Sequence, residues 1–140
     1  MNLTSQNYNL FKFITLFVRS VTEQSSVVWS SSITEDDSNA LERIQKVALR
    51  IIYRHEYESY ENALNLSNLP TLANRRDKLL KNFALKTLKN PKTAHMIRKN
   101  KPNRTLRSQE KFTVDNARTA RLANSTLNKI AHILNKTQAK

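Results

Sequence analysis

The chain has 140 residues, a formal net charge of +13 at pH 7, and neither cysteine nor glycine. This length suits one domain that buries roughly two-thirds of its unfolded surface. The missing glycine excludes glycine-rich phosphate loops, and the missing cysteine excludes disulfides, thiol nucleophiles and zinc knuckles. Residues 1–61 hold six Lys/Arg and eight Asp/Glu, whereas residues 62–140 hold eighteen and three. The second half is therefore expected to face a polyanion, with a merely solvated basic surface as the alternative.

The first expected element is the apolar run at residues 10–21. It carries Lys12 and Arg19 and is too short to span a bilayer, which needs about twenty apolar residues. Six of its apolar residues follow one helical face: Leu10, Phe13, Ile14, Phe17, Val18 and Val21. We expect a buried helix here. A signal segment is the alternative, although neither a leading positive charge nor a small-residue cleavage site is convincing.

The second expected helix begins after Thr34, which is placed as its N-cap, with Asp37 three positions later. Asp36 and Asp37 then lie in the first turn, where the helix dipole favours negative charge. We interpret this Asp-Asp pair as helix-capping acid rather than as catalytic metal ligands. Five residues are expected to form the core seam of the helix: Leu41, Ile44, Ala48, Ile51 and Ile52. The basic opposite side suits either nucleic acid or solvent.

Three tyrosines follow, Tyr53, Tyr57 and Tyr60, close to basic residues. Aromatic rings beside arginines can stack on nucleic-acid bases. Structural packing with the hydroxyl at the rim is the favoured interpretation, because Tyr53 continues one helix and Tyr60 opens the next. Ser59 is expected to cap that next, short helix, which ends near Asn68.

A longer helix is expected from Thr71 to Asn90, where Pro91 stops it. Its inward residues are expected to be Leu72, Leu79, Leu80, Phe83, Ala84 and Leu88. Its outward or flanking residues are Arg75, Arg76, Lys78, Lys81, Lys86 and Lys89. Because only one acid, Asp77, interrupts these cations, this helix is the strongest candidate contact surface in the chain.

Residues 92–111 form a basic segment with few apolar anchors, expected to be a flexible linker that contacts phosphates through Arg104 and Arg107. Beyond it, residues 112–114 are extended in character. A final helix is expected from Ser125, with its inward residues being Leu127, Ile130, Ala131 and Leu134. The three histidines, His55, His95 and His132, are too far apart for metal-ligand spacing and are interpreted as surface residues.

Several blocks follow one another along the chain in a characteristic order: residues 17–20, Trp29, residues 41–46, residues 48–52, Tyr60-Glu61, residues 69–72 with Arg75-Arg76, and residues 117–122. In order and spacing they resemble the C-terminal region of non-LTR (jockey-type) retrotransposon reverse transcriptases, over roughly residues 10–135. The resemblance implies a parent RNA-directed DNA polymerase of a mobile element. It also implies that this chain corresponds to a helical region beyond the palm and thumb, without the catalytic aspartates.

We therefore expect one all-α domain over residues 1–140, a small bundle of about four to five helices that is not an enzyme by itself. No cofactor, metal or membrane is expected. The expected partner is the phosphate backbone of RNA or DNA, bound by Arg75, Arg76, Lys78, Lys81, Arg104 and Arg107. The missing polymerase body or another protein is a further partner through residues 10–21. The alternative is a domesticated helical protein-interaction module that does not bind nucleic acid.

Overall fold

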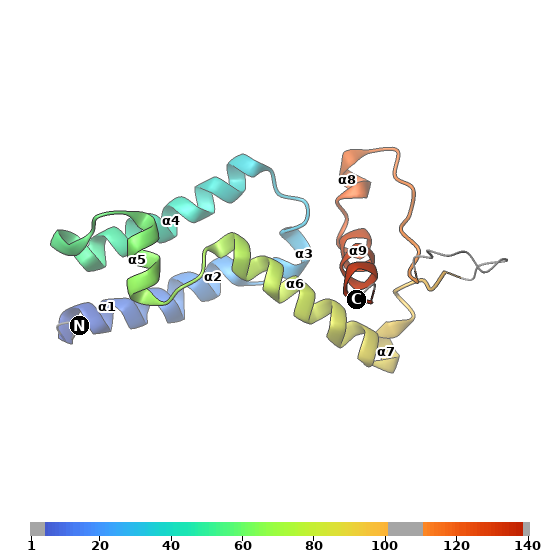
Figure 1. Ribbon diagram of the computed structural model, residues 1–140, viewed down its shortest axis with the longest axis horizontal. Helices are drawn as coiled ribbons and strands as arrows, with labels where there is room; N and C mark the ends of the chain where they lie inside the picture. Colours follow the sequence, from blue (N-terminus) through green and yellow to red (C-terminus); the bar gives the residue numbers. More distant parts are fainter. Residues whose placement is uncertain (1–4, 101–110, 139–140) are drawn as a thin grey trace. The chain divides into compact units, whose positions relative to one another are not determined.

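The computed structural model describes residues 5–100 and 111–138, which are all-α apart from one isolated antiparallel bridge between Lys99 and Phe112 (Figure 1). The all-α expectation is confirmed at this level. The elements are α1 (Ser5–Phe13), the π-helix η1 (Ile14–Val18), α2 (Arg19–Glu23), α3 (Ser26–Trp29), α4 (Glu35–Tyr53), the 3-10 helix η2 (Arg54–Glu56), α5 (Tyr60–Ser67), α6 (Leu72–Lys89), α7 (Pro91–Ala94), α8 (Ala120–Ala123) and α9 (Thr126–Gln138). None of the helices described is long and apolar enough to cross a bilayer.

The chain divides into two compact units. Unit 1 takes in residues 1–26 and 33–76, and unit 2 takes in residues 27–32 and 77–140. Each unit has a hydrophobic core of its own. The sequence pointed to one helical domain, whereas the structure places two separate cores along the chain.

The core of unit 1 is formed by α4, α5 and the N-terminal helices, and its buried residues are Ile14, Leu49, Ile52, Tyr53, Ala63 and Leu64. The seam expected on α4 is wrong at Ile44 and Ile51, which are 46% and 51% exposed. The buried side of α4 instead carries Gln45 beside Leu49 and Ile52. The Gln45 amide donates to the Tyr60 hydroxyl, and this partner makes a polar residue acceptable in the core.

The expected buried helix at residues 10–21 is also corrected. Ile14 is buried, but four apolar side chains are largely exposed: Phe13, Leu16, Phe17 and Val21. The π-helix η1 takes more than 3.6 residues per turn, so it rotates the residues that follow it, such as Val21, relative to a regular α-helix. As a result, the charged Arg19 faces inward with 4% exposure. The rings of Phe13 and Phe17 stack on each other with centroids 5.1 Å apart.

The helix boundaries follow the capping residues in the sequence. Thr34 and Asp37 form a reciprocal capping box at the start of α4, so the interpretation of the Asp-Asp pair as first-turn acid is confirmed. Ser59 caps α5 by accepting from the Asn62 N–H, and Asn68 ends that helix in the left-handed region at φ 52°. Thr71 accepts from the Asn74 N–H at the start of α6. Local hydrogen bonding thus fixed these ends, as expected.

The core of unit 2 is formed by Leu80, Ala84, Ile97, Phe112, Ile130, Ala131 and Leu134. Phe83 and Leu127 were expected inward but are 43% and 49% exposed. At the start of the segment expected to be a basic linker, α7 extends to Ala94 and Ile97 is buried in this core. Residues 101–110, which include Arg104 and Arg107, lie outside the described residues.

Candidate nucleic-acid interface

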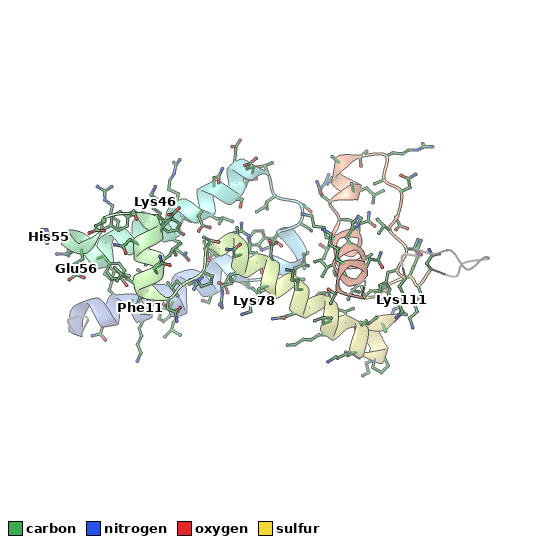
Figure 2. All side chains as sticks on the ribbon, in the orientation of Figure 1. Phe11, Lys46, His55, Glu56, Lys78 and Lys111 are labelled. Carbon is green, nitrogen blue, oxygen red and sulfur yellow. The ribbon has the colours of Figure 1, made fainter. Side chains whose placement is uncertain are left out.

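Helix α6 has a buried side and a lysine side. Its buried residues recur every three or four positions: Leu72, Arg76, Leu80, Ala84 and Thr87. At 100° per residue, Lys78 and Lys89 lie on the opposite side and Lys81 lies at its edge, and all three are exposed. Figure 2 labels Lys78 on this helix. Two of the expected contact residues, Lys78 and Lys81, are therefore available to a ligand.

Arg75 and Arg76, in contrast, hold unit 1 together. Arg76 is only 6% exposed, and its guanidinium donates to the Ser38 hydroxyl over 2.6 Å. The expectation that Arg76 points outward is wrong, because position 76 falls on the buried side of α6. Arg75 forms an ion pair with Glu23, which offsets its charge. These two arginines are thus structural contacts rather than a free basic surface.

The Arg19 side chain belongs to a polar cluster in unit 1. It donates to the Pro70 carbonyl over 3.1 Å and lies 3.7 Å from the Glu23 carboxylate. Burial lowers the pKa of Arg19 from its ordinary value, and the nearby charge of Arg75 lowers it further, while Glu23 opposes the shift. The sequence did not reveal this role, because Arg19 sits within an apolar run.

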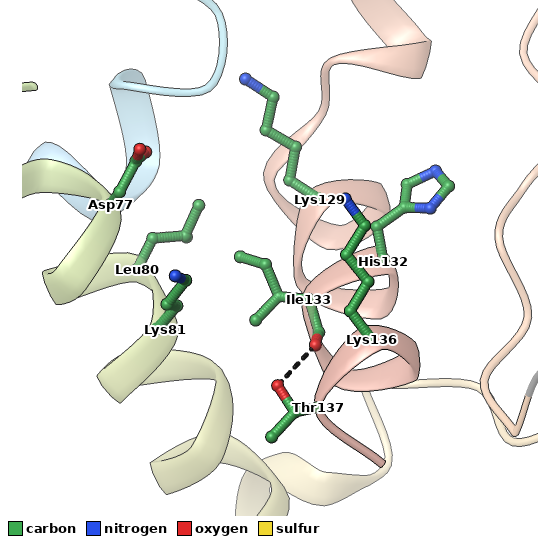
Figure 3. Close-up of a pocket in the computed structure, with 8 residues that line it drawn as sticks. All are labelled: Asp77, Leu80, Lys81, Lys129, His132, Ile133, Lys136 and Thr137. Carbon is green, nitrogen blue, oxygen red and sulfur yellow. Dashed lines mark hydrogen bonds between the residues drawn. The ribbon is translucent and has the colours of Figure 1, made fainter. Parts of the chain in front are cut away.

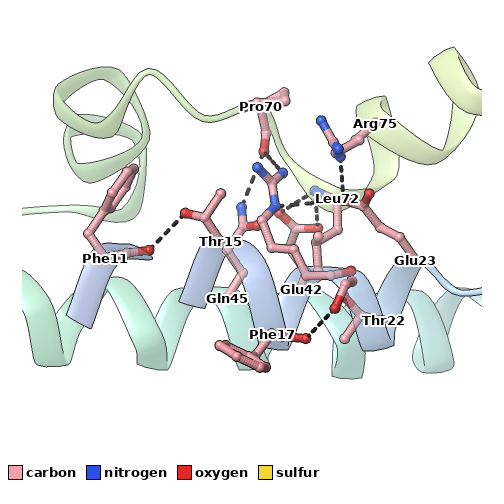
Figure 4. A network of polar contacts seen from close by, with 12 residues as sticks. Phe11, Thr15, Phe17, Thr22, Glu23, Glu42, Gln45, Pro70, Leu72 and Arg75 are labelled. Carbon is pink, nitrogen blue, oxygen red and sulfur yellow. Dashed lines mark hydrogen bonds and ion pairs between the residues drawn. The ribbon is translucent and has the colours of Figure 1, made fainter. Parts of the chain in front are cut away.

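The Glu42 carboxylate connects α4 to the first turn of α6 (Figure 4). It accepts from the Leu72 N–H over 3.0 Å and from the Tyr60 hydroxyl. Burial first, and then the hydrogen bond to Glu42, raise the pKa of Tyr60. Tyr53 is buried and Tyr57 packs against the same core. The three tyrosines therefore pack within unit 1, in line with the structural interpretation of these residues.

A cleft lies between α6 and α9 in unit 2, with a volume of about 610 Å³ (Figure 3). Its lining residues are Asp77, Leu80, Lys81, Lys129, His132, Ile133, Lys136 and Thr137. Leu80 and Ile133 point toward each other between the two helices. Lys81 comes from α6, and Lys129, His132 and Lys136 come from α9. The cleft therefore has an apolar floor and a cationic rim.

Four of the residues expected to bind nucleic acid lie within the described parts of the chain, and of these four Lys81 lines the cleft. Lys129, His132 and Lys136 were not expected as site residues. Their spacing of i, i+3 and i+7 is the sequence signal that places these three residues on one face of the last helix. The Thr137 hydroxyl donates to the Ile133 carbonyl over 2.8 Å within α9. Three ammonium groups against one carboxylate make the cleft suited to anions.

Residues 5–100 and 111–138 contain no group of three or more His, Cys, Asp or Glu side chains that is placed to hold a metal ion. His55, His95 and His132 are all exposed, as expected of surface histidines. The lysines around the cleft would act as point charges toward phosphate groups.

Comparison with known proteins gives no relative for this chain. No protein-family model matches it, and no curated protein or solved structure is significantly similar to it. The chemistry of its own residues and the resemblance of its sequence blocks are what bear on its function.

Proposed function

We propose that the chain is a C-terminal fragment of a non-LTR retrotransposon RNA-directed DNA polymerase that binds the phosphates of RNA or DNA without sequence preference. The observation that carries this function is the cleft of unit 2, where Lys81, Lys129 and Lys136 surround one opening. The blocks of sequence similarity to reverse transcriptases support the same assignment.

Phosphate recognition fits the composition of unit 2. Lysine ammonium groups neutralise phosphates and release condensed counterions, and this term supplies most of non-specific nucleic-acid affinity. Such contacts position a protein on the backbone but carry no base information. Lys78 and Lys89, exposed on α6 outside the cleft, extend the same positive field along the helix.

The fragment is not an enzyme by itself in this proposal. Polymerases hold two metal ions about 3.5–4 Å apart with a carboxylate cluster. Asp36 and Asp37 occupy the first turn of α4, where Asp37 is engaged with the Thr34 N-cap. These carboxylates serve a helix end and therefore do not supply a polymerase centre.

Salt dependence tests this function directly. Binding of fluorescent RNA and DNA oligonucleotides should weaken linearly in a plot of log affinity against log salt, because each phosphate contact releases counterions. About three to five contacts predict a slope of about −2 to −4.5, depending on strandedness. Absence of binding at low salt, or affinity that does not change with salt, would contradict the proposed function.

A second candidate function is favoured by one observation in unit 1. Phe13, Leu16, Phe17 and Val21 expose between 52% and 72% of their surface along α1, η1 and α2. Exposed apolar side chains gathered on one segment are typical of protein-binding sites. A helical protein-interaction module would use this segment, and its association would be insensitive to salt.

A further inference from the structure

The cleft differs from the rest of the lysine surface in having an apolar floor. Leu80 is 4% exposed, and Ile133 is partly buried against the unit 2 core. Both side chains lie between α6 and α9, with the lysines around them (Figure 3). On the opposite side of α6, Lys78 and Lys89 are exposed without lining the cleft. The chain thus has two kinds of basic surface. One is the concave cleft with its apolar floor, and the other is the open surface that carries Lys78 and Lys89.

A nucleic-acid duplex fits only the open basic surface. Its base faces are stacked inside the helix, so it presents phosphates and groove edges to a protein. Binding a duplex at the cleft would leave the exposed part of the Ile133 side chain uncovered. A single strand exposes a flat, largely apolar base next to each phosphate, and single-strand binding sites combine a positive groove with a surface for the base.

The dimensions and charges of the cleft suit one base together with its neighbouring phosphates. A volume of about 610 Å³ falls within the roughly 300–1,000 Å³ of small-ligand sites. Lys129 and Lys136 on α9 and Lys81 on α6 can neutralise the phosphates on either side of a base. Asp77 repels phosphate at its own position and so favours placement of the backbone along the lysines.

We infer that the α6–α9 cleft binds single-stranded nucleic acid in preference to duplex, with a base packing against the exposed part of Ile133 and the flanking phosphates on Lys81, Lys129 and Lys136. This inference rests on the proposed phosphate-binding function. It adds a substrate class, single strands with intact bases, and a location for the base.

The test compares three fluorescent ligands of about eight nucleotides with the whole chain at one low salt concentration. They are a single strand, the same strand with abasic sites throughout, and a blunt duplex. We expect the single strand to bind about fivefold or more tightly than the abasic strand, which carries the same charge and lacks only the bases. We expect it also to bind more tightly than the duplex.

Matched double variants locate the preference. Lys129→Ala with Lys136→Ala should reduce the preference for the intact single strand, whereas Lys78→Ala with Lys89→Ala removes the same charge outside the cleft and should weaken all three ligands alike. Thermal melting of each variant checks that its fold is retained. The variant Ile133→Ala keeps every charge, and it should also reduce the preference for the intact single strand.

Equal affinity for the three ligands would overturn the single-strand inference while leaving phosphate binding intact. A preference that survives both the Lys129/Lys136 and the Ile133 changes would place the base elsewhere and also overturn it. Failure of all three ligands to bind would instead contradict the proposed function itself.

Discussion

The side-chain amide of Gln45 donates a hydrogen bond of 3.2 Å to the backbone carbonyl of Pro70. Gln45 is 2% exposed, so this contact places a polar residue in the middle of the buried side of α4. The link joins α4 to the chain just before α6. It explains why Leu49 and Ile52 face the core while Ile44 and Ile51 do not.

Substitutions on the two sides of α4 should differ in their effect on the free energy of unfolding. Leu49 has no exposed surface, so Leu49→Ala should lower the free energy of unfolding by about 2–5 kcal/mol through lost burial and the cavity left behind. Ile44→Ala removes a half-exposed side chain and should cost less than about 1 kcal/mol. Urea denaturation of both variants measures the difference, and equal losses would show that the buried side is assigned wrongly.

Removing the Glu42 carboxylate should loosen the start of α6. Glu42→Ala leaves the Leu72 N–H and the Tyr60 hydroxyl without their acceptor, and a lost partner of this kind costs about 1–3 kcal/mol. Glu42→Gln keeps one acceptor oxygen and should cost less. Chemical denaturation compares the two, and a Glu42→Ala variant as stable as the parent would refute a role for this carboxylate in joining α4 to α6.

Stability at alkaline pH should depend on Tyr60. Burial and the Glu42 hydrogen bond raise the pKa of Tyr60, and burial raises the pKa of Tyr53. A raised tyrosine pKa means that the fold favours the neutral phenol. Its contribution is fully present below the unfolded pKa of about 10 and is lost as the pH rises toward the folded pKa.

The free energy of unfolding should therefore hold steady near neutral pH and fall above about pH 10. Tyr60→Phe removes one of the titrating groups and should make that alkaline fall shallower, although the variant is less stable at neutral pH. Leu49→Ala serves as the control, since it lowers stability without removing a phenol. An alkaline slope identical in parent and Tyr60→Phe would argue against the raised pKa.

Local sequence signals were enough to place the starts of α4, α5 and α6. Thr34, Ser59 and Thr71 each provide a side-chain oxygen for a nearby backbone N–H, and these bonds depend only on residues three positions away. Helix faces were less predictable where a polar contact or a π-turn intervenes. Gln45 is buried through partners distant in sequence, and η1 shifts the register of residues 14–18.

The candidate site was predicted only in part, for a similar reason. Lys81 was identified because α6 has a clear lysine side, but charge counting cannot distinguish it from Arg76, which is buried and bonded to Ser38. Lys129 and Lys136 lie more than forty residues further along the chain, and only the packing of α9 against α6 brings them to the same cleft.

The purified chain should extend no primer on an RNA or DNA template with Mg²⁺ or Mn²⁺. Asp37 is occupied at a helix N-terminus, and nucleotide addition needs carboxylates that hold two metals close together. Gel analysis of primer products tests this, with an active reverse transcriptase in the same buffer as the positive control. Template-dependent extension by the chain would refute its assignment as a fragment without the palm.

The salt slope of nucleic-acid binding, measured in two double variants, tests the central claim most directly. Lys81→Ala with Lys136→Ala should flatten the log–log slope by about one to two units, because each lost phosphate contact removes about 0.7–0.9 of a unit. Arg75→Ala with Arg76→Ala should leave the slope unchanged and lower the melting temperature, since these arginines bind Glu23 and Ser38. A slope flattened by the arginine pair but not by the lysine pair would contradict the assignment of the phosphate site to the α6–α9 cleft.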